Sequence, residues 1–166
     1  MRYVWTRGPS KGARALAKAL KAKRVRAGAG PMILEGTVIN WGDSQCPYAQ
    51  ALNPAAAIKL AANKLQAFNA FQAAGVPIPR FATDKAVAAA WGVTVVVRHK
   101  LTGHSGEGIE IVAAGQELPD APLYVEYIKK EQEYRIHVGY KNPTNVNPHF
   151  VNETVQIISI QRKARR

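Results

Sequence analysis

One stretch constrains the fold of this chain more than any other: two β-branched runs joined by a glycine-rich segment. The first run, at 93–98, leads into the cations Arg98 and Lys100, and the second run, at 109–112, begins directly after Gly108. Glycines let backbone N–H groups approach an anion without interference from a Cβ atom, and neighbouring cations neutralise it. The stretch therefore predicts either a loop that covers phosphate groups or a plain β-hairpin whose glycines only turn the chain.

The composition is typical of a globular protein. Of the 166 residues, 47% are hydrophobic and 20% are charged, and no apolar run approaches the roughly 18–20 residues that span a membrane. A single cysteine, Cys46, excludes an internal disulfide framework and a cysteine-based zinc site. The basic N-terminal segment lacks the apolar region of a secretory signal. We therefore expect a cytoplasmic protein without membrane contact.

The net charge of +12 is concentrated at the two ends of the chain. Nine cations and no acids lie in residues 2–26, four cations lie in residues 162–166, and the centre is close to neutral. A charge polarised in this way indicates an anionic partner, of which nucleic acid is the usual one. The alternatives are a solvated basic face, or cations whose acidic partners lie on a separate chain.

The first half of the chain predicts a small α/β unit followed by helices. Strands are expected at 3–5, 23–26 and 37–40, with a helix at 11–21 capped by Ser10, and this order favours a parallel sheet. Asn53-Pro54 predicts a helix start, with the cap followed by proline at the first helical position. The helical region then breaks at Asn63, which caps a second helix, and it ends at Gly75.

The second half predicts a mixed helix-and-strand body. A short helix capped by Thr83 or Asp84 ends at Trp91, and strands are expected at 93–98, 109–112, 123–128, 133–140 and 154–161, with a long loop at 142–152. The expected fold class is therefore α/β (α+β).

The familiar phosphate-binding motifs do not fit. The sequence contains no G-x-x-x-x-G-K-[ST], and the glycine-rich segment lacks G-x-G-x-x-G and leads into a strand instead of a helix. Kinase and Rossmann interpretations are therefore disfavoured.

An ordered set of features carries more information than any single motif. It consists of the Asn40-Trp41-Gly42-x-Ser44 turn, Asn63-Lys64-Leu65 at a helix start, an Ala-Gly-Val-Pro-x-Pro turn at 74–79, the cation-ended strand with its glycine loop, the strand at 124–128, and Glu133 seven residues after Glu126. This order resembles the ATP-grasp superfamily, and more closely its phage-encoded carboxylate–amine ligase-like branch. The resemblance covers most of the chain.

The resemblance implies a phosphate side of the site. Lys64 matches a helix-start lysine that touches nucleotide phosphates, although an exposed helix lysine is the alternative. Arg98 matches the strand-end position over the α-phosphate, although the family more often has a lysine there. Lys100 is a second candidate for that role, because side chains two residues apart on a strand point the same way. The resemblance implies that the flap over the phosphates includes Gly103, Ser105, Gly106 and Gly108. We expect His104 to be an ordinary loop residue without a catalytic role.

The resemblance also implies an adenosine side. Glu126, Tyr127 and Ile128 resemble the hinge whose backbone groups pair with the adenine edge. Glu133 falls where the family places the acid that holds the ribose hydroxyls, and Arg135 resembles a cation on the phosphate or substrate side. The alternatives are a solvent-facing Glu126, and a surface ion pair between Glu133 and Arg135 on one strand face.

One departure from the family concerns the metal. The resemblance implies ATP with Mg²⁺, and ATP-dependent carboxylate–amine ligation, in which metal ions bridge the phosphate oxygens. The family holds those ions through a further C-terminal segment, E-x-N, but this chain has no acid after Glu153. We therefore expect no metal ligands in this chain, and its catalytic residues stay unassigned.

This departure leaves three interpretations. The first is a truncated or split ligase that a second chain completes. The second is an inactive ATP-grasp scaffold that serves as a basic interaction module for nucleic acid or a protein. The third is an assembly component whose exposed sheet surface promotes a homo-oligomer. The expected domains are a small N-terminal pre-ATP-grasp-like unit at 1–52, a helical linker at 53–75, an ATP-grasp-like N-terminal lobe at 76–128 and an incomplete C-terminal lobe at 129–166.

Overall fold

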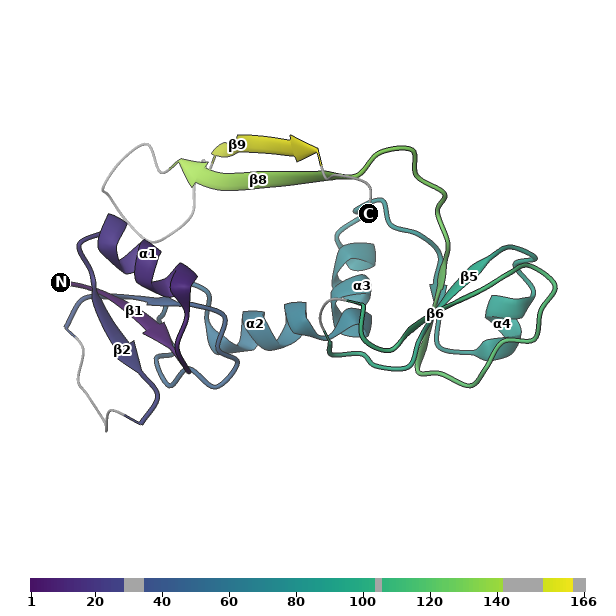
Figure 1. Ribbon diagram of the computed structural model, residues 1–166, viewed down its shortest axis with the longest axis horizontal. Helices are drawn as coiled ribbons and strands as arrows, with labels where there is room; N and C mark the ends of the chain where they lie inside the picture. Colours follow the sequence, from purple (N-terminus) through teal and green to yellow (C-terminus); the bar gives the residue numbers. More distant parts are fainter. Residues whose placement is uncertain (29–34, 104–105, 142–153, 163–166) are drawn as a thin grey trace. The chain divides into compact units, whose positions relative to one another are not determined.

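The computed structural model describes residues 1–28, 35–103, 106–141 and 154–162 (Figure 1). The chain forms two units, Met1–Tyr127 and Ile128–Arg166. The loop expected at 142–152, together with His104 and Ser105 of the expected flap, lies outside the described residues. Among the helices that the structure describes, none has the length and apolar character needed to cross a membrane.

The first unit begins with a three-stranded parallel sheet in the order β2-β1-β3. The central strand β1 (Arg2–Thr6) pairs with β2 (Lys23–Arg26) and β3 (Thr37–Asn40). Helix α1 (Lys11–Ala19) connects β1 to β2 and lies against one face, where Val4 is buried with Ala13 and Ala17 (Figure 1). The opposite face buries Trp5 and Val38 against residues 46–51. Both faces are therefore covered, as a parallel sheet requires.

The helices α2 (Ala55–Ala62) and α3 (Lys64–Ala73) follow this sheet. The expected break is confirmed, because the Asn63 side chain accepts a hydrogen bond from the Gln66 backbone N–H at 3.1 Å and caps α3. The expected start of α2 is wrong by one residue. Pro54 is itself the N-cap and offers no side-chain acceptor, while Asn53 has a φ of 59° in the left-handed region. Asparagine tolerates that conformation better than most residues, so Asn53 turns the chain instead of capping the helix.

The second sheet is antiparallel, in the order β4-β7-β5-β6. Its strands are β4 (Phe81–Ala82), β5 (Val95–Arg98), β6 (Ile109–Val112) and β7 (Leu123–Glu126). The short helix α4 (Lys85–Ala89), capped by Asp84, contributes Ala88 to a core with Val95, Val97 and Tyr124. The sequence did not predict β4, because a two-residue strand carries no period, and β7 ends two residues earlier than expected.

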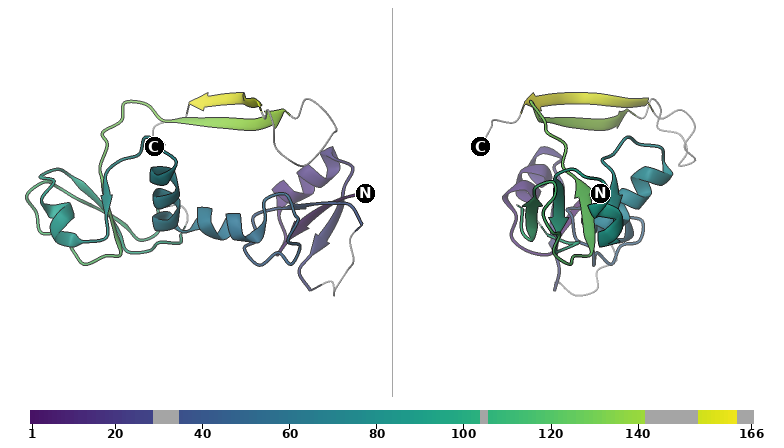
Figure 2. Two further views of the ribbon diagram at one scale, coloured as in Figure 1. Left: turned by 180° about the vertical axis from the view of Figure 1, so that it is seen from behind. Right: turned by 90° about the vertical axis from the view of Figure 1, so that its right-hand side faces the viewer.

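The second unit contains a two-stranded antiparallel ladder (Figure 2). Its strands are β8 (Tyr134–Lys141) and β9 (Thr154–Arg162), and the pairing register shifts between residues 137 and 138. Tyr134, Ile136, Ile157 and Ile160 are each more than half exposed. Within the described residues, this ladder therefore leaves apolar side chains in contact with solvent.

Candidate functional site

A cavity of about 300 Å³ lies beneath the glycine loop that joins β5 to β6. Three cations line it, together with one carboxylate, two loop glycines and one apolar residue of β6. Five of the lining residues were singled out from the sequence, and Glu107 and Ile109 were not. Among the described residues, the lining is Lys64, Arg98, Lys100, Gly103, Gly106, Glu107 and Ile109.

Backbone hydrogen bonds hold the elements around this cavity together. The Lys64 N–H donates to the Leu101 carbonyl oxygen at 2.8 Å, which fastens the start of α3 to the segment that follows β5. The His99 N–H donates to the Gly108 carbonyl oxygen at 2.8 Å, so the two ends of the glycine loop meet. The half-buried Lys64 and the cations that follow β5 thus reach one site although they lie far apart in the sequence.

Arg98 is the cation with the least favourable surroundings. Its Nε atom is buried and has no hydrogen-bond partner in the part of the chain that the structure describes. Burial also lowers the pKa of the Arg98 guanidinium below its ordinary value, because the charged form loses hydration. A buried unpaired donor on a cation is costly, so Arg98 is an unfavourable group in the wall of the cavity.

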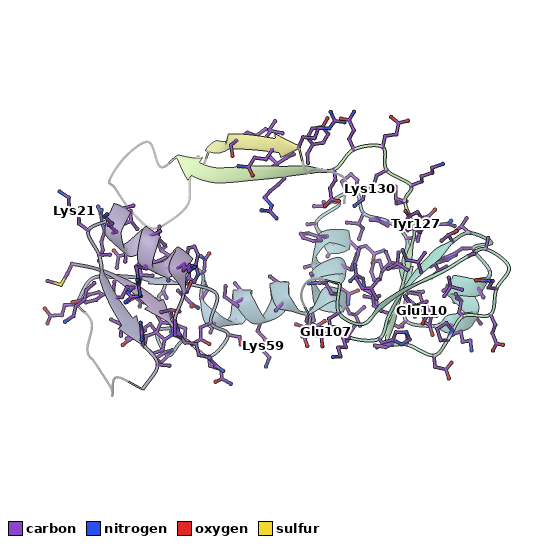
Figure 3. The ribbon with its side chains drawn as sticks, in the orientation of Figure 1. Lys21, Lys59, Glu107, Glu110, Tyr127 and Lys130 are labelled. Carbon is purple, nitrogen blue, oxygen red and sulfur yellow. The ribbon has the colours of Figure 1, made fainter. Side chains whose placement is uncertain are left out.

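Glu107 places a negative charge among these cations. Its carboxylate forms an ion pair with Lys100 Nζ, and Figure 3 shows Glu107 on the loop near the beginning of α3. Gly108 allows this turn: its φ is +68°, and a Cβ atom there would lie 3.0 Å from Lys100 Cγ. The ligand-free loop therefore partly neutralises its own cations.

The expected hinge lies at the end of β7. Arg80 holds Glu126 through two hydrogen bonds, from Nε at 2.8 Å and from Nη2 at 3.2 Å. These bonds lower the pKa of the Glu126 carboxyl. The Glu126 side chain is 22% exposed and pairs with Arg80, so its implied role beside the adenine stays a prediction. The N–H groups of Glu126 and Tyr127 donate to the carbonyl oxygens of Arg80 and Thr94, each at 2.9 Å, so neither is free to pair with a base.

Arg80 carried no signal in the sequence. Its guanidinium also lies over the Trp91 ring, 5.5 Å from the ring centroid. The contact with Glu126 depends on the pairing of β4 with β7, in which Phe81 lies opposite Val125. Because β4 was not predicted, its neighbour Arg80 could not be placed beside the hinge.

The remaining predicted residues that the structure describes, Ile128, Glu133 and Arg135, belong to the second unit. Glu133 is 2.6 Å from Lys130 Nζ, and β8 begins one residue after it, so Glu133 does not share a strand face with Arg135. Arg135 is exposed, opposite Gln161 in the ladder. Ile128 opens the second unit. Their implied roles, like that of Ser105, stay predictions.

The donor set of the cavity fits phosphate groups and does not fit a metal ion. Amine and guanidinium cations bind phosphate oxygens, whereas Mg²⁺ prefers carboxylates and other oxygen ligands. In the described ranges of the chain, no cluster of three or more histidine, cysteine, aspartate or glutamate side chains could hold a metal. The described lining of the cavity therefore suits an anion better than a metal ion.

Two solved structures have a similar fold. The RimK-domain ATP-grasp protein from Sphaerobacter thermophilus matches 81% of this chain and 67% of its own, with a TM-score of 0.53 and 16% identity. D-alanine–D-alanine ligase from Bacillus anthracis matches 100% of this chain and 72% of its own, with a TM-score of 0.51 and 13% identity. No protein-family model matches the sequence, and no curated protein sequence matches it. The expected α+β, ATP-grasp-like fold is confirmed.

Proposed function

We propose that the chain is an ATP-grasp-like nucleotide-binding protein, related to ATP-dependent carboxylate–amine ligases of the phage-encoded branch. The cavity beneath the glycine loop holds the phosphates of ATP. Lys64, Arg98 and Lys100 neutralise them, and the backbone N–H groups of the loop cover them. The observation that carries this proposal is that three cations, Lys64, Arg98 and Lys100, line one cavity at the glycine loop.

The ligase activity requires more than this chain supplies in its described residues. In such a reaction ATP supplies the phosphoryl group that activates a carboxylate, and Mg²⁺ offsets the charge on the phosphate oxygens. Metal ligands would then come from a second chain or from a further segment. This chain contributes phosphate binding and exclusion of water beneath its loop.

Thermal unfolding in the presence of ATP and MgCl₂ tests the proposal. A ligand at a hundredfold excess over its Kd stabilises the folded state by about 2.7 kcal/mol and raises Tm by several degrees in a chain of this size. We expect such a rise in the unmodified protein and a much smaller one in Arg98→Ala and Lys64→Ala. Lys59→Ala is the matched control, because Lys59 is exposed on α2 and does not line the cavity. No rise at millimolar ATP would overturn the proposal.

A second candidate function is a basic interaction module for nucleic acid. Lys11, Arg14 and Lys18 are exposed along one side of α1, and no acid lies in residues 2–26. This function predicts affinity for DNA or RNA that falls steeply between low and moderate salt. Replacing the three cations by Gln should flatten that dependence, whereas replacing Lys59, Lys85 and Lys130 should leave it unchanged. An equal effect of the two triple variants would contradict it.

A further inference from the structure

A second cleft, of about 330 Å³, lies in the first unit at the carboxyl ends of β1 and β3. Two loops form it, residues 6–10 after β1 and residues 41–44 after β3. The cleft shares no described residue with the cavity beneath the glycine loop, so a ligand in this cleft would occupy a site separate from the one proposed for the nucleotide. Its volume is at the lower end of the range for ligand pockets and suits a molecule the size of an amino acid.

The topology of the sheet explains why a cleft forms there. β1 and β3 are neighbours and parallel, but the chain leaves them toward opposite faces. After β1 it enters α1, which covers the face carrying Val4, and after β3 it enters residues 46–51, which cover the face carrying Trp5. Such a point of divergence at the carboxyl ends of parallel strands is where open α/β sheets bind ligands.

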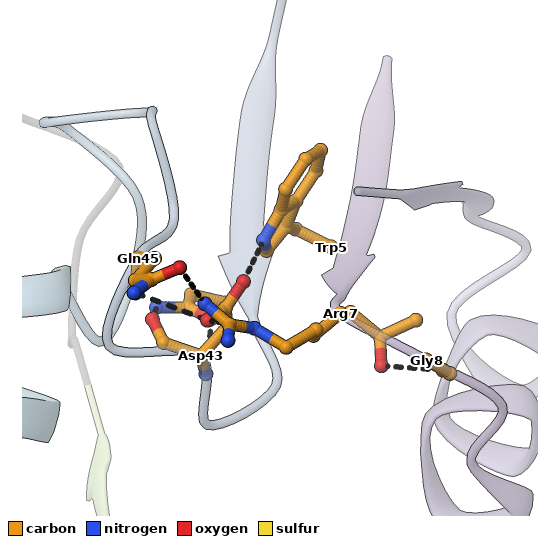
Figure 4. Close-up of polar contacts among 7 residues, drawn as sticks. Trp5, Arg7, Gly8, Asp43 and Gln45 are labelled. Carbon is orange, nitrogen blue, oxygen red and sulfur yellow. Dashed lines mark hydrogen bonds and ion pairs between the residues drawn. The ribbon is translucent and has the colours of Figure 1, made fainter. Parts of the chain in front are cut away.

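Arg7 is held in position at this cleft by a buried acid (Figure 4). The side chain of Asp43 is only 4% exposed; its Oδ2 accepts from Trp5 Nε1 at 2.9 Å, and its Oδ1 accepts from Arg7 Nε at 3.2 Å. Arg7 Nη2 donates to the Gln45 side chain. One edge of the guanidinium is thus occupied. Within the described residues Nη1 has no hydrogen-bond partner, which leaves a second pair of N–H donors for a planar anion.

Trp41 supplies an apolar wall. It is 43% exposed, and its ring is fixed against the first turn of α1, since a Cβ atom at Gly12 would lie 2.6 Å from Trp41 Cζ2. The loop that carries it is rigid because the Asn40 side chain bonds to both the N–H and the carbonyl oxygen of Asp43. An exposed aromatic ring beside a positioned guanidinium can hold a molecule with an apolar body and an anionic end.

We propose that this cleft binds a small carboxylate-bearing molecule, with Arg7 holding the carboxylate and Trp41 covering the apolar portion. The carboxylate matches the planar fork that remains on Arg7, and the buried Asp43 fixes that fork without presenting a free charge to the ligand.

Titration of the full chain with benzoate, followed through the indole N–H signals in ¹H–¹⁵N NMR spectra, tests this proposal. We expect a saturable shift of the Trp41 signal, with the Trp91 signal unmoved. Benzamide has the same shape without the charge and should bind about tenfold or more weakly, as expected for losing a charged hydrogen-bonded pair. Phenyl phosphate tests whether the cleft prefers a carboxylate or a phosphate group. If phenyl phosphate bound more tightly than benzoate, the choice of a carboxylate would be overturned.

Arg7→Lys is the informative variant, because it keeps a cation beside Asp43 and removes the planar fork. We expect it to weaken benzoate binding about tenfold, while Lys59→Gln, an exposed change on α2 outside the cleft, leaves binding unchanged. Arg7→Gln provides a second test, with its folded state checked by the dispersion of the same spectrum. Equal responses to benzoate and benzamide, or unchanged affinity in Arg7→Lys, would overturn the proposal.

Discussion

Glu107 is the one carboxylate among the side chains that line the cavity beneath the glycine loop. Its ion pair with Lys100 occupies a cation that nucleotide phosphates would also contact. Glu107→Gln should therefore strengthen ATP binding, by about three- to tenfold given the modest strength of exposed ion pairs. Isothermal titration calorimetry measures this change. Glu110→Gln is the control, because Glu110 pairs with His99 and does not line the cavity, and a weaker affinity in Glu107→Gln would contradict the prediction.

Asp43 makes a pH-dependent contribution to stability. Burial raises the pKa of its carboxyl, but hydrogen bonds from Trp5 and the Gln45 backbone, with the charge of Arg7, outweigh burial and leave the pKa below its ordinary value. The charged form is thus favoured by folding. Its contribution is complete above the unfolded-state pKa of about 3.9 and is lost as the pH falls through the lower folded-state pKa.

Asp43→Asn should lower the free energy of unfolding by about 1–3 kcal/mol at pH 7, because buried donors lose a charged acceptor. The difference from the unmodified protein should shrink as the pH falls below about 4. Urea unfolding at pH 7 and pH 3 measures both values. Asp120→Asn, an exposed change, should have little effect at either pH, and a difference for Asp43→Asn that does not change with pH would refute this assignment.

Single residues show how far the sequence predicts the site. Arg98 and Lys100 could be named because they end a β-branched run before a glycine-rich segment, and Lys64 was named through the resemblance to the ATP-grasp superfamily. Their common cavity depends on the hydrogen bond between the Lys64 N–H and the Leu101 carbonyl oxygen, which joins α3 to a segment far away in sequence. Arg80 was missed for the same physical reason, since strand pairing and not sequence spacing places it beside Glu126.

At the scale of elements, the glycine loop depends on Gly108. Its positive φ, and the 3.0 Å that would separate an added Cβ atom from Lys100 Cγ, make any side chain there unfavourable. Gly108→Ala should lower the free energy of unfolding by about 1–2 kcal/mol. Gly103→Ala is the control, because its nearest contact would be an ordinary 3.5 Å. Thermal unfolding compares the two, and equal Tm values would show that the loop accommodates the change.

The ends of the helices show which structural features the local sequence determines and which it does not. Ser10, Asn63 and Asp84 cap helices as expected, because a cap is a contact between residues three apart or fewer. The start of α2 was misplaced because a proline can be the N-cap as well as the first helical residue, and only the backbone at Asn53 distinguishes the two.

At the scale of the whole molecule, we expect the second unit to be the less stable part. β8 and β9 form a two-stranded ladder with Ile136, Ile157 and Ile160 more than half exposed, and an isolated pair of strands is marginally stable in water. We expect its amides to exchange with solvent about a hundredfold faster than those of β5 in native-state hydrogen exchange. Similar protection of both sheets would contradict this expectation.

The concentration dependence of that exchange distinguishes two interpretations of the exposed side chains. If copies of the chain associate through the ladder, protection of β8 and β9 should rise with protein concentration, and it should not rise if a different chain covers them. The fold at this scale was predicted from a resemblance to the ATP-grasp superfamily. The sequence itself contains no pattern that determines how strands far apart in the chain pair.

The buried guanidinium of Arg98 affects how the stability of this protein could be engineered. Its buried Nε lacks a partner within the described residues, so the ligand-free protein carries an unfavourable group that an apolar side chain of similar length would remove. Arg98→Met should raise Tm while abolishing the response to ATP. Such a trade between stability and activity is common where proteins bind ligands. Selection for thermostability alone would then tend to replace Arg98 and remove the proposed nucleotide site.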